Sequence, residues 1–426
     1  MLKRKVIRKL TSIVGQENIL TDQEDLVTYS YDAVDKKFFP EAVVFPSSSE
    51  EISALLKLAN QEQFPVIPRG AGSGFTGGTL AVYGGVVLVM SRFNRIIEID
   101  TENLTSVVEP GVVCGDFQKE VEKYGLYYPP DPASLAFSTL GGNVAECAGG
   151  PSALKYGVTR DYVTGLEVVL PTGEIITTGV KTMKGVVGYD LTRLIVGSEG
   201  TLAIVTKIYL RLIPKPESTV TLMALFNKIE ASTKTVATII RNQIVPSKLE
   251  FMDQGSIECV ENYRRLGLLP ETKALLLIEL DGDPIAVEKQ AHRVEALCRE
   301  SGSFRVERAS TQEEAERIWE VRRAISPSLL QLNLKKINED IVVPRSKIPH
   351  IIHRMEEIQQ SFHLKIVNFG HAGDGNIHVN VMFDDNIPGE EEKANQAIRE
   401  IFQTVLEVEG TISGEHGIGI TKAPFL

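Results

Sequence analysis

The chain has 426 residues, and its 43% hydrophobic and 24% charged composition is typical of soluble globular protein and excludes extended disorder. This length predicts two or three packed domains. The formal net charge of −11 argues against nucleic acid as a partner, because nucleic-acid binding needs a dense cationic face. A membrane helix needs ~20 apolar residues in a row, and no stretch of the sequence approaches that length.

The four cysteines are far apart and form no CxxC pair. Their spacing excludes an ordinary iron–sulfur cassette within this chain and is consistent with a reducing cytoplasm, where we expect the protein to be. The basic N-terminus, MLKRKVIRKL, lacks the continuous apolar core of a signal peptide.

The first half of the chain predicts short β-rich units with one clear βαβ arrangement. A strand at 41–45 leads into a helix that serines 47–49 cap, and a second strand follows at 64–68. Turn residues separate the further predicted elements, which are strands at 86–90, 96–100 and 106–109, a helix at 116–123, and hairpin strands at 166–170 and 174–178.

The Pro-rich passage 213–216 is the predicted boundary between a domain at 1–215 and a domain at 216–426. After it, longer helical patterns alternate with strands such as 274–279 and 365–369. All seven histidines lie in the second half. This asymmetry indicates a cofactor domain followed by a domain with acid–base and metal chemistry.

The first chemical signal is the glycine-rich segment 68–78, PRGAGSGFTGG. Gly72, Gly74 and Gly77 spell GxGxxG, but a Rossmann fingerprint must open a helix, and 79–85 has two more glycines and no apolar helical face. We therefore reject a Rossmann site. Such a loop can instead form a backbone nest for an anion, or it can be a flexible surface loop.

Three further loops follow in order, PPDPAS, STLGGNVAECAGG and GSEGTLAIVT. Together with PRGAGSGFTGG they resemble the FAD domain of the vanillyl-alcohol oxidase superfamily, and in particular the branch of the glycolate oxidase FAD subunit and FAD-linked D-lactate dehydrogenases. The resemblance extends from about Val27 to the last residue. It implies an α+β fold with a two-subdomain FAD-binding domain of the p-cresol methylhydroxylase (PCMH) type and an α/β cap domain with an antiparallel sheet.

The resemblance also implies which residues contact FAD. Pyrophosphate contacts are expected from Arg69, Gly70, Ala71, Gly72, Ser73, Gly74, Gly77 and Gly78, beside Pro68. Other FAD contacts are expected from Pro132, Ser134, Ser138, Thr139, Gly142, Asn143, Ala145, Ala148, Glu199, Gly200 and Ile204. Relatives that attach FAD covalently use a histidine in the first half, where this chain has none, so we expect noncovalent FAD.

The second chemical signal is the segment 371–380, HAGDGNIHVN. Two histidines on either side of a Gly-Asp-Gly turn can converge on one ion, and Asn376, His378 and Asn380 alternate along the predicted strand that follows. Glu415 and His416 lie between glycines in SGEHGIG, a pattern that by itself favours a solvated turn.

In the family that the chain resembles, HxGDGNxH and GEHGxG form one active site. The resemblance implies His371, His378 and Glu415 as metal ligands and His416 as the general base. These donors suit Zn²⁺, Mn²⁺ or Fe²⁺, and zinc is the metal that we expect.

Arg322 lies on a predicted helix that also carries Ala315, Ile318 and Ile325. One arginine of the pair 322–323 would ordinarily extend to solvent. The resemblance implies that Arg322 binds the substrate carboxylate and that Asn380 helps to hold the substrate. A substrate-binding lysine of some relatives lies near Lys336, in a register that the sequence leaves open.

The resemblance therefore implies oxidation of a small D-2-hydroxy acid, such as D-lactate or glycolate, with His416 taking the hydroxyl proton and flavin N5 taking the C2 hydride. Because the chain has no cysteine cluster, the electrons must leave through a partner. We expect an iron–sulfur subunit or an electron-transferring flavoprotein, which could hold the protein at the membrane periphery.

Three alternatives remain open. A same-fold alkyl-dihydroxyacetone-phosphate synthase would carry a histidine run in the second half, which this chain lacks. A 2-hydroxyglutarate dehydrogenase would need extra basic contacts that the sequence does not reveal. A truncated, noncatalytic electron-transfer subunit is the third, because relatives continue beyond the position of Leu426 with a helix and an Asn-Pro-Gly-Lys tail.

Overall fold

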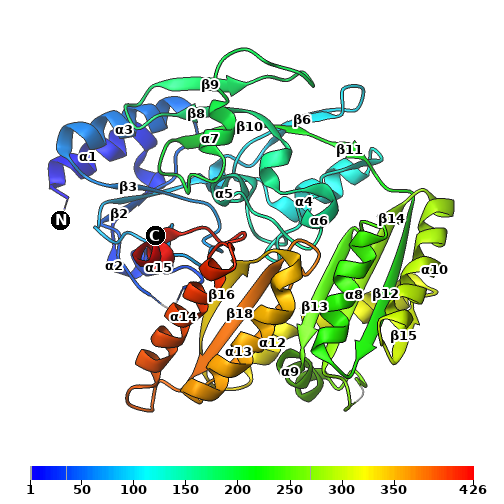
Figure 1. Ribbon diagram of the computed structural model, residues 1–426. Coiled ribbons are helices and arrows are strands. Elements are labelled where there is room, and N and C mark those ends of the chain that lie inside the picture. Colours follow the sequence, from blue (N-terminus) through cyan, green and yellow to red (C-terminus); the bar gives the residue numbers. More distant parts are fainter. Residues whose placement is uncertain (1, 35, 269) are drawn as a thin grey trace. The chain divides into compact units, whose positions relative to one another are not determined.

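The computed structural model describes residues 2–34, 36–268 and 270–426 (Figure 1). Packing divides the chain into two compact units, each described here by itself. The first unit contains Met1–Gly150, Gly157–Lys215 and Glu415–Leu426, and the second contains Pro151–Tyr156 and Pro216–Gly414. One transition falls at the predicted boundary, but the units are not the two continuous segments 1–215 and 216–426.

Specific side chains hold the segment 151–156 in the second unit. The Lys155 ammonium donates to the carbonyl of Asp281 at 2.7 Å, and the Tyr156 hydroxyl donates to the Asp281 carboxylate at 2.8 Å. Both contacts join residues more than a hundred positions apart, which is why no local sequence pattern indicated this excursion of the chain.

A four-stranded sheet forms one half of the first unit. Its strands, in spatial order, are β1 (Ile19–Leu20), β2 (Ala42–Val44), β4 (Val86–Val89) and β3 (Val66–Arg69). The predicted βαβ unit is present as β2, helix α3 (Ser49–Glu62) and β3, but β4 lies between the two strands and is parallel to both. Ser48 caps α3 by accepting from the N–H of Glu51. The helix buries Ile52 and Leu55 against this sheet together with α1 (Arg4–Val14).

A five-stranded antiparallel sheet forms the other half of the first unit. Its order is β5 (Ile96–Asp100), β6 (Thr105–Val108), β10 (Ile204–Arg211), β8 (Val163–Val169) and β9 (Ile175–Gly179). Buried and half-buried residues alternate along β10, as expected for a strand with one face in a core. Short helices α4 (Cys114–Glu122), α5 (Leu140–Glu146) and α7 (Leu191–Ile195) complete this half.

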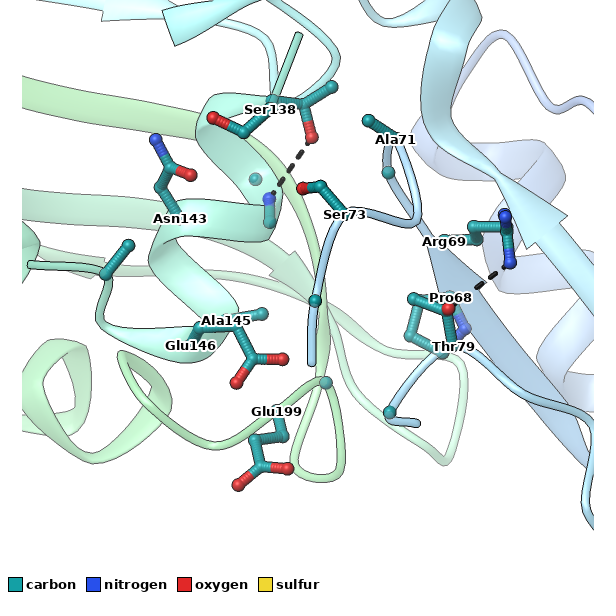
Figure 2. Close-up of a pocket in the computed structure, with 18 of the residues that line it drawn as sticks. Pro68, Arg69, Ala71, Ser73, Thr79, Ser138, Asn143, Ala145, Glu146 and Glu199 are labelled. Carbon is teal, nitrogen blue, oxygen red and sulfur yellow. Dashed lines mark hydrogen bonds between the residues drawn. The ribbon is translucent and has the colours of Figure 1, made fainter. Parts of the chain in front are cut away.

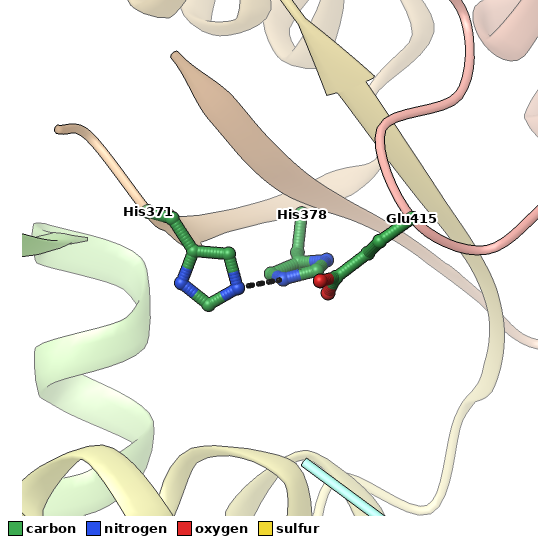
Figure 3. A group of neighbouring side chains, drawn as sticks. All are labelled: His371, His378 and Glu415. Carbon is green, nitrogen blue, oxygen red and sulfur yellow. Dashed lines mark hydrogen bonds between the residues drawn. The ribbon is translucent and has the colours of Figure 1, made fainter. Parts of the chain in front are cut away.

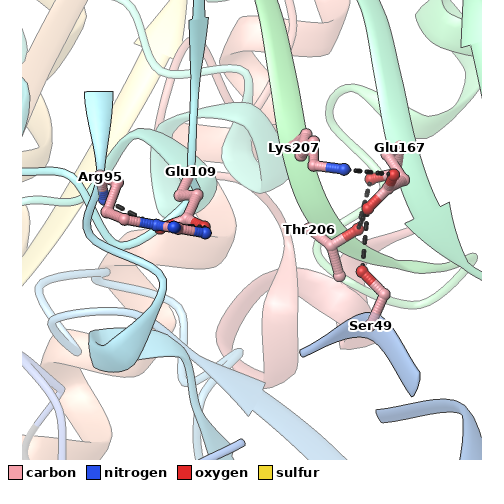
Figure 4. Close-up of polar contacts among 6 residues, drawn as sticks. All are labelled: Ser49, Arg95, Glu109, Glu167, Thr206 and Lys207. Atoms are coloured by element: carbon pink, nitrogen blue, oxygen red, sulfur yellow. Dashed lines mark hydrogen bonds and ion pairs between the residues drawn. The ribbon is translucent and has the colours of Figure 1, made fainter. Parts of the chain in front are cut away.

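Glu167 on β8 links the two halves of the first unit (Figure 4). Its carboxylate accepts from the Ser49 hydroxyl of α3 at 2.8 Å, from Thr206 at 2.9 Å and from the Lys207 ammonium at 2.7 Å. Burial alone would raise the pKa of Glu167, but these hydrogen bonds outweigh it and hold the pKa below its usual range. The half-buried carboxylate is thus stabilised in its charged form. Figure 4 also shows the Glu109 carboxylate, which accepts from Arg95.

The second unit contains a seven-stranded sheet in which all pairings are antiparallel. Its order is β15 (Arg305–Arg308), β12 (Ser218–Phe226), β14 (Ala274–Gly282), β13 (Lys248–Asp253), β17 (Lys365–Gly370), β18 (Asn376–Phe383) and β16 (Lys335–Val342). This confirms the predicted α+β class and the antiparallel sheet of the second domain.

Two groups of helices pack on this sheet. One group contains α9 (Gln254–Arg264), α11 (Gln312–Arg323) and α12 (Ile325–Leu330) and shares a core with Met252, Leu277 and Phe369. The other contains α8 (Ile229–Arg241), α10 (Pro284–Glu300), α13 (Ile348–Phe362) and α14 (Glu390–Glu407). The helix predicted around Arg322 ends at Arg323, and Ile325 begins a separate helix. Among the helices in the described ranges, none has the length and apolar composition that crossing a bilayer requires.

Candidate active site

The first unit contains a cleft with about 1350 Å³ of empty space, counted to its open mouth (Figure 2). Most of its wall comes from four segments of the chain, 68–79, 132–134, 138–149 and 195–205, which combine loops with helix α5 and the ends of β3 and β10. Every residue that the sequence assigned to FAD lines this cleft except Gly77, which lies beside it in the same loop. Lining residues that sequence reasoning missed include Asp32, Phe75, Met90, Glu146 and Ser198.

The glycine-rich loop leaves β3 at Arg69 without entering a helix. Residues 70–85, all of which the structure describes, form bends and turns, so the rejection of a Rossmann site is confirmed. A Cβ atom on Gly70 would lie 2.3 Å from the Thr139 hydroxyl oxygen, which explains why this position has no side chain. Within the described ranges, the backbone N–H groups of residues 70–75 donate to no protein acceptor. A run of unpaired N–H groups in a cleft is suited to bind an anionic group.

The side chain of Arg69 supports the loop from behind. Its guanidinium donates to the carbonyl of Tyr31 at 2.9 Å and to the Thr79 hydroxyl at 3.2 Å, and Figure 2 shows it turned toward Thr79. Burial lowers the pKa of Arg69, and the charge of nearby Asp32 opposes that shift. These contacts give the Arg69 side chain a bracing role within the loop.

The last residues of the chain also belong to the first unit. The Glu199 carboxylate accepts from the N–H groups of Ile418 and Gly419, each at 2.7 Å, and the Thr76 carbonyl accepts from the N–H of Ile420 at 2.8 Å. These bonds hold His416 in the wall of the cleft, where its ring lies 5.0 Å from the ring of Phe75. Glu199 thus lines the cleft as predicted and also anchors the segment that carries His416.

His371 and His378 lie side by side in the second unit, on either side of the turn between β17 and β18 (Figure 3). Their Nε2 atoms are 3.5 Å apart, and both residues are buried. A Cβ atom on Gly375 in this turn would lie 2.1 Å from the Val343 carbonyl oxygen, and its φ of +93° is unfavourable for other residues. The tight turn is what brings the two imidazoles together.

Glu415 directly follows Gly414, the last residue of the second unit. Asp340 of β16 holds this point of the chain, because its carboxylate accepts from the N–H of Gly414 at 2.8 Å. One ligand atom each from His371, His378 and Glu415 lies within 4.8 Å of the others (Figure 3). This donor set of two imidazoles and a carboxylate has the composition of many protein metal sites.

Glu250 connects the histidine pair with Arg322. Its Oε1 lies 2.6 Å from His371 Nδ1, and its Oε2 accepts from Arg322 Nε at 2.6 Å. The guanidinium lies over the ring of Phe369, 4.7 Å from its centroid. Burial by itself would raise the pKa of Glu250, but His371 and Arg322 outweigh it and hold that pKa well below its usual range. Sequence reasoning missed Glu250, although an acidic residue between Leu249 and Phe251 in a buried strand was a usable signal.

Two weaker substrate candidates lie on the neighbouring strands. Asn380 is fully buried, and its amide donates to the Val367 carbonyl at 3.2 Å and accepts from Asn338 at 2.6 Å. Both ends of the side chain are thus engaged with protein. Lys336 on β16 alternates with Asn338, so the two share one face of the sheet, and burial lowers its pKa.

The structure has two candidate functional parts: a cleft suited to an anionic ligand in one unit, and an arginine–histidine–carboxylate cluster in the other. Family models identify the class of protein as a flavoenzyme, because residues 40–179 match the FAD binding domain and residues 215–426 match the C-terminal domain of FAD linked oxidases. The chain belongs to the family of FAD-linked oxidoreductases.

Named relatives extend over nearly the whole chain. It is 45% identical to the glycolate oxidase subunit GlcD of Bacillus subtilis, over 100% of this chain and 91% of that protein. It is 36% identical to GlcD of Escherichia coli, over 99% and 84%, and 35% identical to a D-lactate dehydrogenase of Anaerostipes hadrus, over 99% and 90%.

Solved structures share the fold at low identity. A substrate-bound p-cresol methylhydroxylase superposes with a TM-score of 0.79 at 18% identity, over 98% of this chain and 89% of the other. An alkyldihydroxyacetonephosphate synthase superposes with a TM-score of 0.78 at 20% identity, over 97% and 82%. These likenesses establish the PCMH-type fold.

Proposed function

We propose that the protein oxidises a small D-2-hydroxy acid, such as D-lactate or glycolate, to the 2-oxo acid. The observation that carries this proposal is that Arg322 and His371 contact the same buried carboxylate, that of Glu250. An arginine fork suits a substrate carboxylate, and the adjacent histidine pair suits a cation that can bind a neighbouring hydroxyl. A 2-hydroxy acid carries these two groups on adjacent carbons. The names of the B. subtilis and A. hadrus relatives support the same substrate class.

FAD would occupy the cleft of the first unit without a covalent bond, because residues 1–291 contain no histidine. The unpaired N–H groups of residues 70–75 would bind its pyrophosphate through the loop backbone. Bound FAD supplies the acceptor for the C2 hydride. Arg322 would orient the substrate by its carboxylate, and the His416 imidazole would take the proton of the hydroxyl.

We extend the proposal to a divalent metal ion held by His371, His378 and Glu415. The donor set fits such an ion, since the three ligand atoms lie within 4.8 Å of one another and Glu250 engages the Nδ1 of His371. Zinc is the ion that we expect, and Mn²⁺ or Fe²⁺ would suit the same donors. A bound ion would act as a Lewis acid toward the substrate hydroxyl.

The electrons would leave through a separate protein, either an iron–sulfur subunit or an electron-transferring flavoprotein. The scattered cysteines support this view, as does the name "subunit" of the B. subtilis relative. We propose that the protein works in the cytoplasm, peripheral to the membrane where its partner is membrane-associated.

A steady-state assay with an electron-accepting dye tests the substrate class. The purified protein should reduce the dye with D-lactate or glycolate. Turnover of L-lactate alone would contradict the proposal. So would the absence of turnover with every acid of a panel that includes D-2-hydroxyglutarate. Preference for D-2-hydroxyglutarate over both smaller acids would contradict the assignment to D-lactate or glycolate.

A further inference from the structure

Glu250 is a buried carboxylate at the centre of the second unit. It lies within β13, is 0% exposed, and pairs in register with Leu277 of β14, a residue of an apolar core. A charge in such surroundings costs several kcal/mol in lost hydration unless it is paired and hydrogen-bonded. Among the described residues, each of its two oxygens has one hydrogen-bonding partner: His371 Nδ1 for Oε1 and Arg322 Nε for Oε2. The two partners therefore account for the presence of this carboxylate.

The contact with His371 selects one tautomer of that imidazole. A carboxylate accepts only, so the nitrogen that faces Glu250 Oε1 at 2.6 Å must carry the proton. In the neutral ring the other nitrogen, Nε2, then has a lone pair. This Nε2 is the atom that lies 3.5 Å from Nε2 of His378, on the side of the candidate metal ligands.

The contact with Arg322 selects one edge of the guanidinium. Glu250 Oε2 takes the Nε–H at 2.6 Å, and the ring of Phe369 lies 4.7 Å from the guanidinium carbon and fixes its plane. The terminal nitrogens Nη1 and Nη2 then form the edge that can bind a carboxylate by two parallel hydrogen bonds.

We propose that Glu250 is the positioning residue of this site, and that it sets the His371 tautomer for cation binding and the Arg322 edge for substrate binding through one carboxylate. This inference rests on the proposed function for the identity of the two ligands. The candidate cation site at His371 and the substrate site at Arg322 would then both depend on the same buried side chain.

Glu250→Gln is the direct test, because glutamine keeps the volume but has one accepting oxygen for two donors. Zinc affinity, measured by competition with a chromogenic chelator, should fall ~10–100-fold, as is typical when the partner of a metal-bound histidine is lost. With zinc at saturation, the KM for D-lactate should rise by a larger factor than kcat falls. Unchanged zinc affinity and unchanged KM would overturn the proposal.

Asp253→Asn is the matched control. Asp253 is also a buried carboxylate of β13, but it accepts from Ser256 and Asn368 and contacts neither Arg322 nor His371. Its substitution should lower stability and leave zinc affinity and KM unchanged. If Asp253→Asn impairs both to the same degree as Glu250→Gln, the effects are general destabilisation and the proposal fails.

The tautomer can also be measured without a Glu250 variant, which keeps the proposal testable if Glu250→Gln does not fold. The flavin-loaded, zinc-free protein would be labelled with ¹⁵N-histidine and studied by NMR at alkaline pH. The resonance that His371→Ala removes should show its proton on Nδ1, whereas a proton on Nε2 would overturn the proposal. Zinc affinity and the His371 tautomer are both measured without catalysis, so a failure of all hydroxy acids to react would refute the proposed function alone.

Discussion

Replacing Glu199 with glutamine should loosen the segment that carries His416. The two carboxylate oxygens of Glu199 accept separately from the N–H groups of Ile418 and Gly419, each at 2.7 Å. Glutamine has one oxygen, and its NH₂ group would face the second N–H, so one hydrogen bond to a charged group is lost. Such a bond contributes about 1.5–3 kcal/mol. At 1.4 kcal/mol per factor of ten, the segment should open roughly 10- to 150-fold more often.

Hydrogen exchange read by mass spectrometry measures this opening directly. The C-terminal peptide covering 415–426 should exchange faster in Glu199→Gln by that factor, while peptides from the second unit stay unchanged. Glu122→Gln is the matched control, since it makes the same substitution in an exposed ion pair with Lys215, where about 0–1 kcal/mol is at stake. Equal exchange of the peptide in wild type and Glu199→Gln would refute the reasoning, as would equal acceleration by both variants.

Four further outcomes are expected. His416→Ala should slow flavin reduction by ~10²–10⁴-fold in rapid-mixing experiments without loss of flavin, and an unchanged rate would exclude a role as base. His378→Ala should lose most bound metal by elemental analysis, and wild-type metal content would refute the ligand set. Acid precipitation should release the yellow colour into the supernatant, whereas colour in the pellet would indicate covalent FAD. Glu167→Gln should lower the unfolding free energy near neutral pH by about 1–3 kcal/mol. The pKa of Glu167 is lowered from 4.5 in the folded state, so this difference in unfolding free energy should vanish as the pH falls through the folded-state pKa. Urea titrations across the pH range measure it, and a difference that persists at low pH would contradict the prediction.

The parts of the site that the sequence predicted are the parts that lie in local patterns. The glycine-rich loop 68–78 and the turn 371–378 each place their functional groups within about ten residues, and the family resemblance assigned roles to these groups. Rejection of a Rossmann site also needed only local information, because the sequence after Gly78 has no apolar helical face. The antiparallel second sheet came from the family resemblance.

The contacts that sequence reasoning missed join distant positions. Glu250 meets Arg322 across 72 residues and His371 across 121, and no periodic pattern links them. The contacts of the Arg69 side chain with Tyr31 and Thr79, 38 and 10 residues away, were likewise not indicated by the sequence. The hydrogen bond between Ile418 and Glu199 spans 219 residues and was missed for the same reason.

The packing of 151–156 in the second unit shows a second limit of prediction from sequence, which concerns domain boundaries. Tyr156 and Lys155 both satisfy Asp281, which lies on β14, so tertiary hydrogen bonds decide where this short segment packs. Composition and turn signals placed the boundary near Pro214 and could not detect a brief departure of six residues.

The most direct test of the proposed function is rapid mixing of the flavin-loaded protein with hydroxy acids in the absence of oxygen. D-lactate or glycolate should bleach the flavin absorbance in a single saturating phase, and L-lactate at the same concentrations should leave it oxidised. Bleaching by L-lactate alone, or by no 2-hydroxy acid, would contradict the account.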